Sequence, residues 1–426
     1  MDHFHNIVFP LPPPPQANDV EAAVPLPTPP DIKGNLDELN AIKSLITNID
    51  AKTWDFLKKK NNPFECVTTN GGLANYTPIS RAYFKMTEIL HLFRGPLEKA
   101  IGLPQPQPQS QAQAQAQAQA HFTTLHLAEG PGGFMECLDN TLRDMRIESS
   151  QYDMYGITLM KEDSKSVPSW KKTAYFLEQH PHMHILTGRD GTGDLYNIDN
   201  IFATAVEMAT GQKASVITGD GGFDFSTDFN QQESMSFPLL YCQAMTALLC
   251  QKPGGMFVLK FFDTYQTKTL QLLCLLRRCY RHLSFVKPYT SRPANSEKYL
   301  VCVDFRNNIT VKDIVVFLKD IPKIGSSPAH HPQLALSKET TAAAAADTAF
   351  YDAIDQMNKC LFARQKEFIL STLELQKTLD DQRKEALFKQ QIYTSTQWCH
   401  RYGIRLNYQS KYLLQSSNSR NEPRVP

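Results

Sequence analysis

The sequence predicts an α/β fold built on a mostly parallel seven-stranded sheet with an antiparallel last strand, plus helical additions at both ends of the chain. Three observations support this prediction. Strand-like and helix-like runs alternate between residues 121 and 325. The first strand-like run meets the glycines of "EGPGGF" and then a helix-like run. The last two strand-like runs are separated only by "SRPANSE", which leaves no room for a helix, so these strands should pair antiparallel.

The strands of the predicted sheet are short runs rich in β-branched and aromatic residues. They are "TTLHLA" (123–128), "MYGITL" (154–159), "MHILTG" (183–188), "ASVITGD" (214–220), "GMFVLKFF" (255–262), "LSFVKPYT" (283–290) and "KYLVCVDF" (298–305). Helices are expected over 134–147, 231–252 and 265–282. A parallel sheet that ends in an antiparallel strand is the usual plan of Rossmann-like methyltransferases, so residues 121–325 are predicted to form a core of that kind.

Three segments precede this core. Residues 1–30 are rich in proline, which favours an extended, solvated chain, and are expected to be a flexible arm. Residues 31–103 are expected to be helical, because apolar residues recur at helical intervals in "NLDELNAIKSLITNID" and in "ISRAYFKMTEILHLF". Residues 104–120, "PQPQPQSQAQAQAQAQA", are uncharged low-complexity sequence and are expected to be a surface insertion.

Two segments follow the core: residues 326–346 are expected to be a linker and residues 347–426 a helical region. Phe350, Ile354 and Met357 recur at steps of three or four, and the pattern continues to Leu379, as on one face of a long helix or a pair of helices. Such a face packs back on the core, dimerises or binds a partner, and the pattern leaves these alternatives open.

The composition excludes several classes of protein. No apolar run reaches the roughly 18–20 residues that span a membrane, and the N-terminus does not resemble a secretory signal. The nine cysteines form no CxxC pair, so we expect free thiols in a reducing compartment and no zinc. His180, His182 and His184 alternate as in a strand, which fits a metal cluster or, more simply, a strand edge. Residues 277–298 are basic, a pattern typical of a solvated face.

The glycine loop "GPGG", residues 130–133, lies where a strand should end and a helix begin, a place where nucleotides bind. It lacks the GxGxxG order of dinucleotide-binding folds, and no Lys-Ser/Thr pair follows it as in a phosphate-binding P-loop. Glycines let the backbone approach an adenosine and an amino-acid tail closely, so a ligand without phosphate suits the loop better. The alternative is a tight turn without a ligand.

Three charged residues stand near the expected ends of strands. Asp220 ends a strand where an α/β sheet forms its ligand crevice, although an aspartate in a turn needs no such role. Lys260 interrupts an apolar strand, and lysine is seldom buried without a reason, although on an edge strand it would reach solvent. Glu297 begins the last strand and by itself would be an ordinary turn acid.

Together these features resemble the FtsJ-like RNA 2′-O-methyltransferases, and most closely their mRNA cap branch. Asp220, Lys260 and Glu297 match the family's Lys-Asp-Lys-Glu tetrad, and "SRAYFKM" supplies its first lysine as Lys85. The motifs "AEGPGGF", "GTGDLYNIDN", "DGGF", "NQQE", "GGMFVLKFFD" and "SRPANSEKYLVC" occur in the family's order, over about residues 70–325. One departure is His126, where many members have an aspartate.

The resemblance implies an enzyme that methylates a ribose 2′-oxygen of the cap-proximal nucleotides of viral mRNA with S-adenosylmethionine. The implied catalytic residues are Lys85, Asp220, Lys260 and Glu297, with no metal. The implied cofactor-binding residues are Glu129, Gly130, Pro131, Gly132, Gly133, Phe134, Asp194 and Asp220, and the implied RNA-binding residues are Arg81, Asn230, Arg292 and Asn295. The rival hypothesis is a weak or inactive protein of this fold that serves as an RNA-binding, structural or accessory subunit.

The chemistry explains why such residues are wanted. A 2′-hydroxyl is a very weak acid that must attack a sulfonium methyl in line, so positioning matters. Lys260 is the candidate to hold or deprotonate this hydroxyl. Lys85 and the sulfonium are expected to depress the pKa of Lys260, while Asp220 and Glu297 limit that shift.

Further expectations concern partners and location. The substrate should be capped RNA and not DNA, because the 2′-hydroxyl is what reacts. The basic stretch 277–298 is then expected to line a groove for RNA phosphates. Other viral RNA-processing or virion proteins are expected partners, a membrane is not, and the expected location is the viral factory of the host cytoplasm or the virion.

Overall fold

The structure is a computed structural model that describes residues 7–13, 22–25, 35–68, 71–103, 121–160, 170, 173–223, 229–326, 335–339 and 348–418. The Gln/Ala insertion at 104–120, most of the linker at 326–346 and the last residues, 419–426, lie outside the described residues. Within the described residues, no helix is long and apolar enough to cross a membrane.

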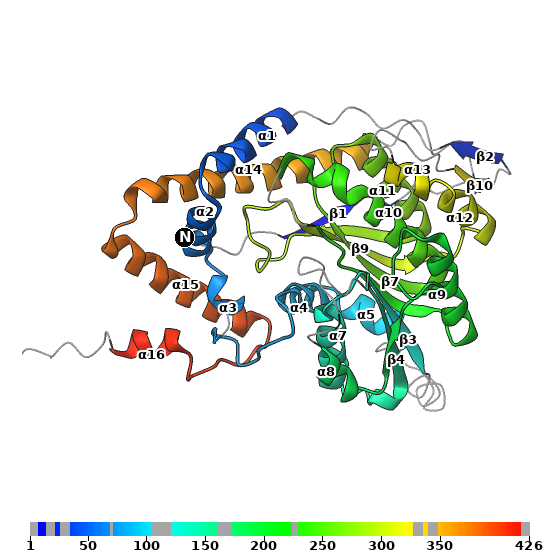
Figure 1. Ribbon diagram of the computed structural model, residues 1–426, viewed down its shortest axis with the longest axis horizontal. Coiled ribbons are helices and arrows are strands. Elements are labelled where there is room, and N and C mark those ends of the chain that lie inside the picture. The colour runs from blue at the N-terminus through cyan, green and yellow to red at the C-terminus, as the bar shows by residue number, and fades with distance from the viewer. Residues whose placement is uncertain are drawn as a thin grey trace, which may run out of the picture.

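The core is a mixed sheet of eight strands in the order β1-β8-β9-β7-β6-β3-β4-β5 (Figure 1). The strands are β1 (Val8–Leu11), β3 (Phe122–Leu127), β4 (Tyr152–Ile157), β5 (Met183–Leu186), β6 (Ala214–Gly219), β7 (Gln251–Phe261), β8 (Tyr280–Val286) and β9 (Lys298–Phe305). β3 to β7 pair parallel, and β9 pairs antiparallel with both β7 and β8. The predicted fold class and its seven strands are therefore confirmed.

The eighth strand, β1, corrects the prediction that residues 1–30 are a flexible arm. Val8–Leu11 pair antiparallel with Leu283–Val286 of β8, and Leu11 is buried in the core. Arg277 donates to the carbonyl oxygens of Pro12 (2.6 Å) and Pro13. Proline lacks an N–H and is tolerated on an edge strand, which is where β1 lies. The density of prolines concealed this strand in the sequence.

Helices cover both faces of the sheet. One face packs against α4 (Ala82–Leu92), α5 (Arg94–Ala100), α7 (Gly133–Asp144) and α8 (Ala174–Glu178). The other packs against α9 (Ile198–Thr210), α10 (Gln232–Cys250), α11 (Thr267–Cys279), α12 (Val311–Leu318) and α13 (Ile321–Ser326). Short 3₁₀ turns occur at η1 (Leu45–Asn48), η2 (Ser149–Gln151) and η4 (Phe229–Gln231), and β2 (Ala22–Pro25) pairs antiparallel with β10 (Ala335–Glu339).

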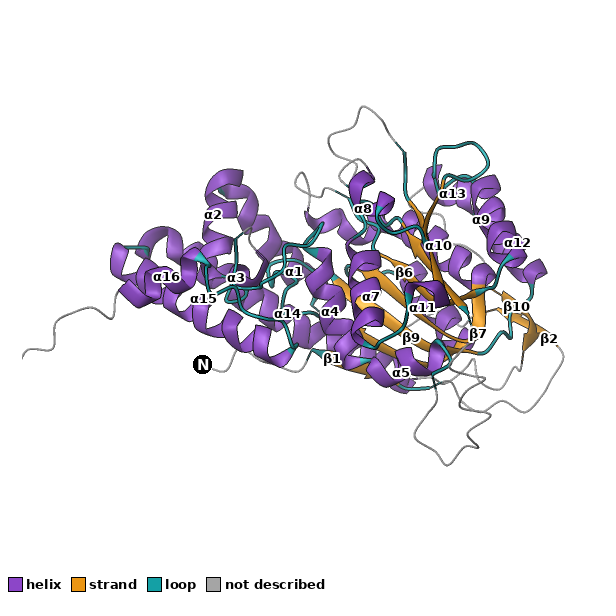
Figure 2. Ribbon diagram, turned by 90° about the horizontal axis from the view of Figure 1, so that it is seen from below, coloured by secondary structure: helices purple, strands orange, loops and turns teal. Residues whose placement is uncertain are grey.

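The terminal additions form a helical lobe beside the sheet (Figures 1 and 2). Its helices are α1 (Leu36–Ser44), α2 (Ala51–Asn61), α3 (Glu65–Thr68), α14 (Thr348–Thr378), α15 (Asp381–Arg401) and α16 (Lys411–Asn418). Asp380 accepts from the Arg383 N–H (2.6 Å) as the N-cap of α15, so the C-terminal pattern is a pair of helices. Phe350 and Ile354 of α14 are fully buried in the sheet core, so this region packs back on the core.

Candidate active site

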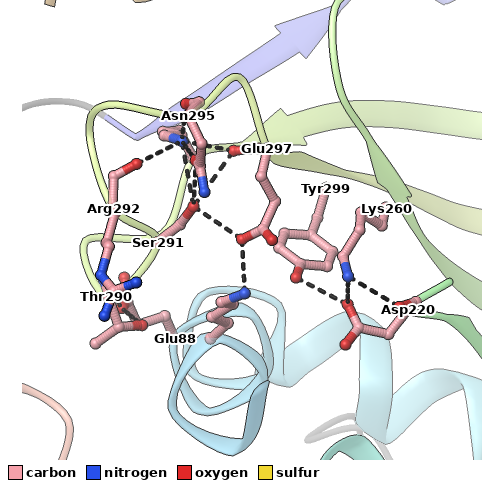
Figure 3. Close-up of polar contacts among 11 residues, drawn as sticks. Glu88, Asp220, Lys260, Thr290, Ser291, Arg292, Asn295, Glu297 and Tyr299 are labelled. Atoms are coloured by element: carbon pink, nitrogen blue, oxygen red, sulfur yellow. Dashed lines mark hydrogen bonds and ion pairs between the residues drawn. The ribbon is translucent and has the colours of Figure 1, made fainter. Parts of the chain in front are cut away.

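The four tetrad side chains lie at the edge where β6 and β7 end. Asp220 follows β6, Lys260 lies on β7, Glu297 immediately precedes β9, and Lys85 comes from α4. The Lys260 Nζ lies 2.8 Å from Asp220 Oδ1 and donates to the Asp220 carbonyl at 2.8 Å (Figure 3). The Lys85 Nζ lies 2.7 Å from Glu297 Oε1. The structure thus brings the four residues together as two ion pairs.

The charges of these pairs stabilise one another. Burial opposes ionisation of Glu297, but Lys85 and Lys260 outweigh it and hold the pKa of this carboxyl far below its usual range. Burial likewise lowers the pKa of Lys260, but the carboxylates of Asp220 and Glu297 prevail and raise it. In the protein itself the pKa of Lys260 is therefore raised rather than depressed, and the part of the expectation that rests on the sulfonium stays a prediction. Lys260 is an ammonium at neutral pH.

Sequence reasoning missed three side chains that hold the tetrad. Tyr299 is fully buried on β9, and its hydroxyl donates to Asp220 Oδ1 (2.9 Å). Ser291 donates to Glu297 Oε1 (2.9 Å). Lys287 donates to the carbonyl oxygens of Asn295 (2.8 Å) and Glu297 (2.7 Å), which closes the turn before β9. The only signal in the sequence for the hydrogen bonds within this turn is the polar composition of "SRPANSE".

The predicted cofactor loop, Glu129–Phe134, joins β3 to α7. Glu129 Oε1 accepts from the backbone N–H groups of Phe134 (2.7 Å) and Met135 (3.1 Å), at the start of α7. The other oxygen, Oε2, is buried and has no hydrogen-bond partner within the described part of the chain. Burial, with the charge of Asp220 next, raises the pKa of Glu129 to about 8. Glu129 and Asp220 are therefore close enough for their charges to interact.

Three features of this edge of the sheet suit a methyl donor with an adenosine and an amino-acid tail. Gly132 has φ +111°, and a Cβ added there would lie 3.3 Å from the Trp170 ring. The unpartnered Glu129 oxygen can accept a hydrogen bond from an ammonium group. Asp194 follows β5 in a loop whose Gly193 packs against the Thr158 carbonyl at the end of β4. The predicted residues therefore fit S-adenosylmethionine along the carboxyl ends of β3 to β6.

Three of the four predicted RNA-binding residues surround the tetrad. Arg81 and Arg292 both contact Glu65 Oε1, each at 3.0 Å, and both are partly exposed. Asn295 lies in the bonded turn that carries Glu297. Asn230 instead donates to Ser44 of α1 (3.2 Å). The Arg292 side chain is 25% exposed and its guanidinium is paired with Glu65.

The basic stretch 277–298 does not form a single groove, which corrects the prediction. Arg277 is buried under β1, and Lys298 is buried and donates to the Phe262 carbonyl. Arg281 is exposed and lies 3.4 Å from Asp304. Arg277 lies on α11, Arg281 on β8 and Lys298 on β9, so these basic side chains come from different elements and do not line one surface.

The histidines have structural partners. His126 is fully buried, and its two ring nitrogens lie 3.0 Å from Thr124 Oγ1 and 2.8 Å from Thr218 Oγ1, so it links β3 to β6. Burial lowers the pKa of His126 to about 3, which keeps it neutral. His182 is buried against Asp139 (2.7 Å). Among the described residues, no group of three or more His, Cys, Asp or Glu side chains is arranged to hold a metal ion.

Comparison with known proteins agrees with this geometry. Cap-specific mRNA (nucleoside-2′-O-)-methyltransferase 2 of Danio rerio is 26% identical over 278 residues, 65% of this chain and 35% of that protein. Cap-specific mRNA (nucleoside-2′-O-)-methyltransferase 1 of Danio rerio is 37% identical over 179 residues, 41% of this chain and 20% of the relative. The cap-specific mRNA (nucleoside-2′-O-)-methyltransferase of Autographa californica nuclear polyhedrosis virus is 33% identical over 148 residues, 35% of this chain and 53% of the relative.

The chain thus spans between about a fifth and half of the length of these relatives. The family model described as FtsJ-like methyltransferase matches residues 78–305, more than half of the 426 residues. This match contains the glycine loop and all four tetrad residues. The chain belongs to the FtsJ-like methyltransferase family.

Proposed function

We propose that this protein transfers a methyl group from S-adenosylmethionine to a ribose 2′-oxygen near the 5′ cap of mRNA. The observation that carries the proposal is the pair of ion pairs, Lys260–Asp220 and Lys85–Glu297, beside the glycine loop. The relatives named for cap-specific 2′-O-methylation support the choice of a capped RNA substrate. Arg81 and Arg292, next to the tetrad, suit the phosphates of such an RNA.

The chain's residues prepare the hydroxyl for attack. When bound, S-adenosylmethionine supplies an electrophilic methyl group. Lys260 is an ammonium held by Asp220, so it donates a hydrogen bond to the 2′-oxygen and fixes its direction. This geometry favours the holding role of Lys260 over deprotonation, because its raised pKa leaves it protonated at neutral pH. The bond from the 2′-oxygen to the methyl carbon forms as the bond from that carbon to sulfur breaks, and the hydroxyl proton passes to solvent. The Lys260 ammonium stabilises the negative charge that develops on the oxygen.

The setting of the reaction is a further part of the proposal. The baculovirus relative supports a viral mRNA as the substrate. We propose that the protein acts where such mRNA is made, in the host cytoplasm or in the virion, beside other RNA-processing proteins.

The experiment measures methyl transfer from labelled cofactor to three matched nucleic acids: a capped RNA, the same RNA with a 5′ triphosphate, and DNA of the same sequence. The proposal expects label on the capped RNA alone, recovered after nuclease digestion as a 2′-O-methylated nucleotide. Label on a base nitrogen, or no transfer to any RNA, would refute it. The second outcome, combined with RNA binding, would support the rival accessory role.

A further inference from the structure

Glu88, a buried carboxylate outside the tetrad, lies on α4 one helical turn after Lys85. Its side chain has no exposed area. Oε2 accepts from the Tyr289 N–H (2.7 Å). Oε1 accepts from the Thr290 N–H (2.9 Å) and the Thr290 hydroxyl (2.7 Å), and Figure 3 shows Glu88 and Thr290. Oε1 also accepts from the indole Nε1 of Trp398 (3.1 Å). Four donors thus converge on one carboxylate.

These bonds lead directly to the tetrad. Thr290 precedes Ser291, whose hydroxyl donates to Glu297 Oε1 at 2.9 Å. The same oxygen lies 2.7 Å from the Lys85 Nζ. The path from Lys85 through Glu297, Ser291 and Thr290 to Glu88 therefore returns to the helix on which it began. A shift of Glu88 would move the turn that carries Glu297.

The donor Trp398 comes from the C-terminal addition. It is fully buried on α15, and its indole meets the ring of Phe84 edge-on, with centroids 5.7 Å apart. Phe84 immediately precedes Lys85. Trp398 thus contacts α4 on both sides of the catalytic lysine.

The same face of α15 is anchored at two more points, spaced as successive helical turns require. Gln391 donates to the carbonyls of Lys59 (2.7 Å) and Asn62 (2.7 Å). Ser395 donates to the carbonyl of Pro63 (3.3 Å). The helix is therefore held against the segment before Glu65 and delivers Trp398 in a fixed position.

We propose that Glu88 and Trp398 are positioning residues of the methyl-transfer site, and that α15, which lies outside the family match at 78–305, is a working part of that site. The inference rests on the proposed function. Trp398 of α15 fixes the position of the Glu88 side chain, and Glu88 fixes the backbone of Tyr289 and Thr290. That backbone in turn holds Glu297 against Lys85.

The test uses the full chain and the variant Trp398→Phe, which removes the indole N–H but keeps a buried aromatic ring. The matched control is Trp54→Phe, since Trp54 is a buried tryptophan of the same lobe that packs against Ile369. Steady-state kcat and KM are measured on capped RNA, with amide hydrogen exchange across residues 288–297 and the melting temperature. Thr290→Val, which removes a different donor to Glu88, is the second variant.

Trp398→Phe should lower kcat about tenfold, leave KM for the cofactor within about twofold, and speed exchange at 289 and 290. Thr290→Val should give the same pattern, and Trp54→Phe should not. Wild-type kcat and exchange in both Glu88-donor variants, or equal losses in Trp398→Phe and Trp54→Phe, would overturn the inference. If the wild-type protein methylates no RNA, the proposed function fails, but the exchange result still decides whether α15 fixes this turn.

Discussion

The two halves of the tetrad are held in different ways. Asp220 directly follows β6, Lys260 lies on the adjacent parallel strand β7 in the interior of the sheet, and Tyr299 of the neighbouring strand β9 bonds the aspartate. Lys85 and Glu297 lie on a helix and in a turn, and that turn is held by the side chains of Lys287, Ser291 and Glu88. The first half is fixed by the ladder of backbone hydrogen bonds, whereas the second depends on side chains.

This difference separates what the core supplies from what the additions supply. A sheet interior holds Lys260 whatever the terminal helices do, because each strand is paired on both sides. The Lys85–Glu297 half instead depends on Glu88, which accepts a hydrogen bond from Trp398 of the C-terminal region. We therefore expect substitutions in the Asp220–Lys260 pair to abolish methyl transfer. Substitutions around the Lys85–Glu297 pair should lower kcat only in part.

The largest effect should follow from breaking the first half at its centre. Lys260→Met keeps the buried stem but removes the ammonium beside Asp220. We expect kcat to fall about a thousandfold, since a positioned proton-transfer or hydrogen-bonding group contributes on that scale. The control is Lys252→Met at an exposed position of the same strand, which should retain wild-type kcat. Equal rates for the two variants would contradict the role of Lys260.

Breaking the second half should show in stability as well as in rate. Glu297→Gln leaves Lys85 without its buried partner, so we expect the free energy of unfolding to fall by about 3 kcal/mol at pH 7. Because the folded-state pKa of Glu297 is lowered, its contribution is present above the unfolded pKa and is lost as the pH falls through the folded value. The difference between wild type and variant should therefore shrink below about pH 4 in urea titrations.

The control for that measurement is Asp304→Asn. Asp304 also pairs with a lysine, Lys99, at 2.8 Å, but this lysine is 58% exposed. Its loss should cost less than about 1 kcal/mol. A similar cost for both variants would show that the Glu297 pair is no better sheltered than a surface pair.

A smaller effect should come from Tyr299→Phe, which removes one bond to Asp220 and leaves the ring in place. One hydrogen bond to a charged group predicts a loss in kcat of about tenfold, with little change in KM for RNA. Tyr280→Phe, a buried tyrosine that bonds Gln251 away from the tetrad, is the control. A rise in the KM for RNA with unchanged kcat would indicate that Tyr299 acts in RNA binding rather than in holding Asp220.

The smallest expected effect concerns Glu129 of the cofactor loop, Glu129–Phe134. With a pKa of about 8, Glu129 is protonated at pH 7, and an ammonium bound beside it would favour the carboxylate. Cofactor binding should therefore release about one proton at pH 7, and affinity should rise with pH until about 8. Calorimetry in buffers of different ionisation enthalpy measures this release. Glu129→Gln should abolish it and the exposed Glu148→Gln should not; unchanged release in Glu129→Gln would exclude Glu129 as its source.

The sequence predicted the first half of the site better than the second. Lys260 stood out as a charge inside an apolar strand, and the alternation of strands and helices placed Asp220 beside it. Tyr299 was hidden, because an aromatic residue in a strand looks like ordinary core. Glu88 was hidden as well, because an acid in an amphipathic helix looks solvated. Contacts between segments as distant as Glu88 and Trp398 leave no local pattern in the sequence.

The most direct test of the account changes a single atom of the substrate. Once the methylated nucleotide has been located, the wild-type protein is given the same capped RNA with hydrogen in place of that one 2′-hydroxyl. The account predicts that methyl transfer at this nucleotide disappears while the affinity for the RNA stays within about threefold, because phosphates supply most of the binding. Methyl transfer that continues at this nucleotide would contradict the assignment of Lys85, Asp220, Lys260 and Glu297 to a ribose 2′-oxygen.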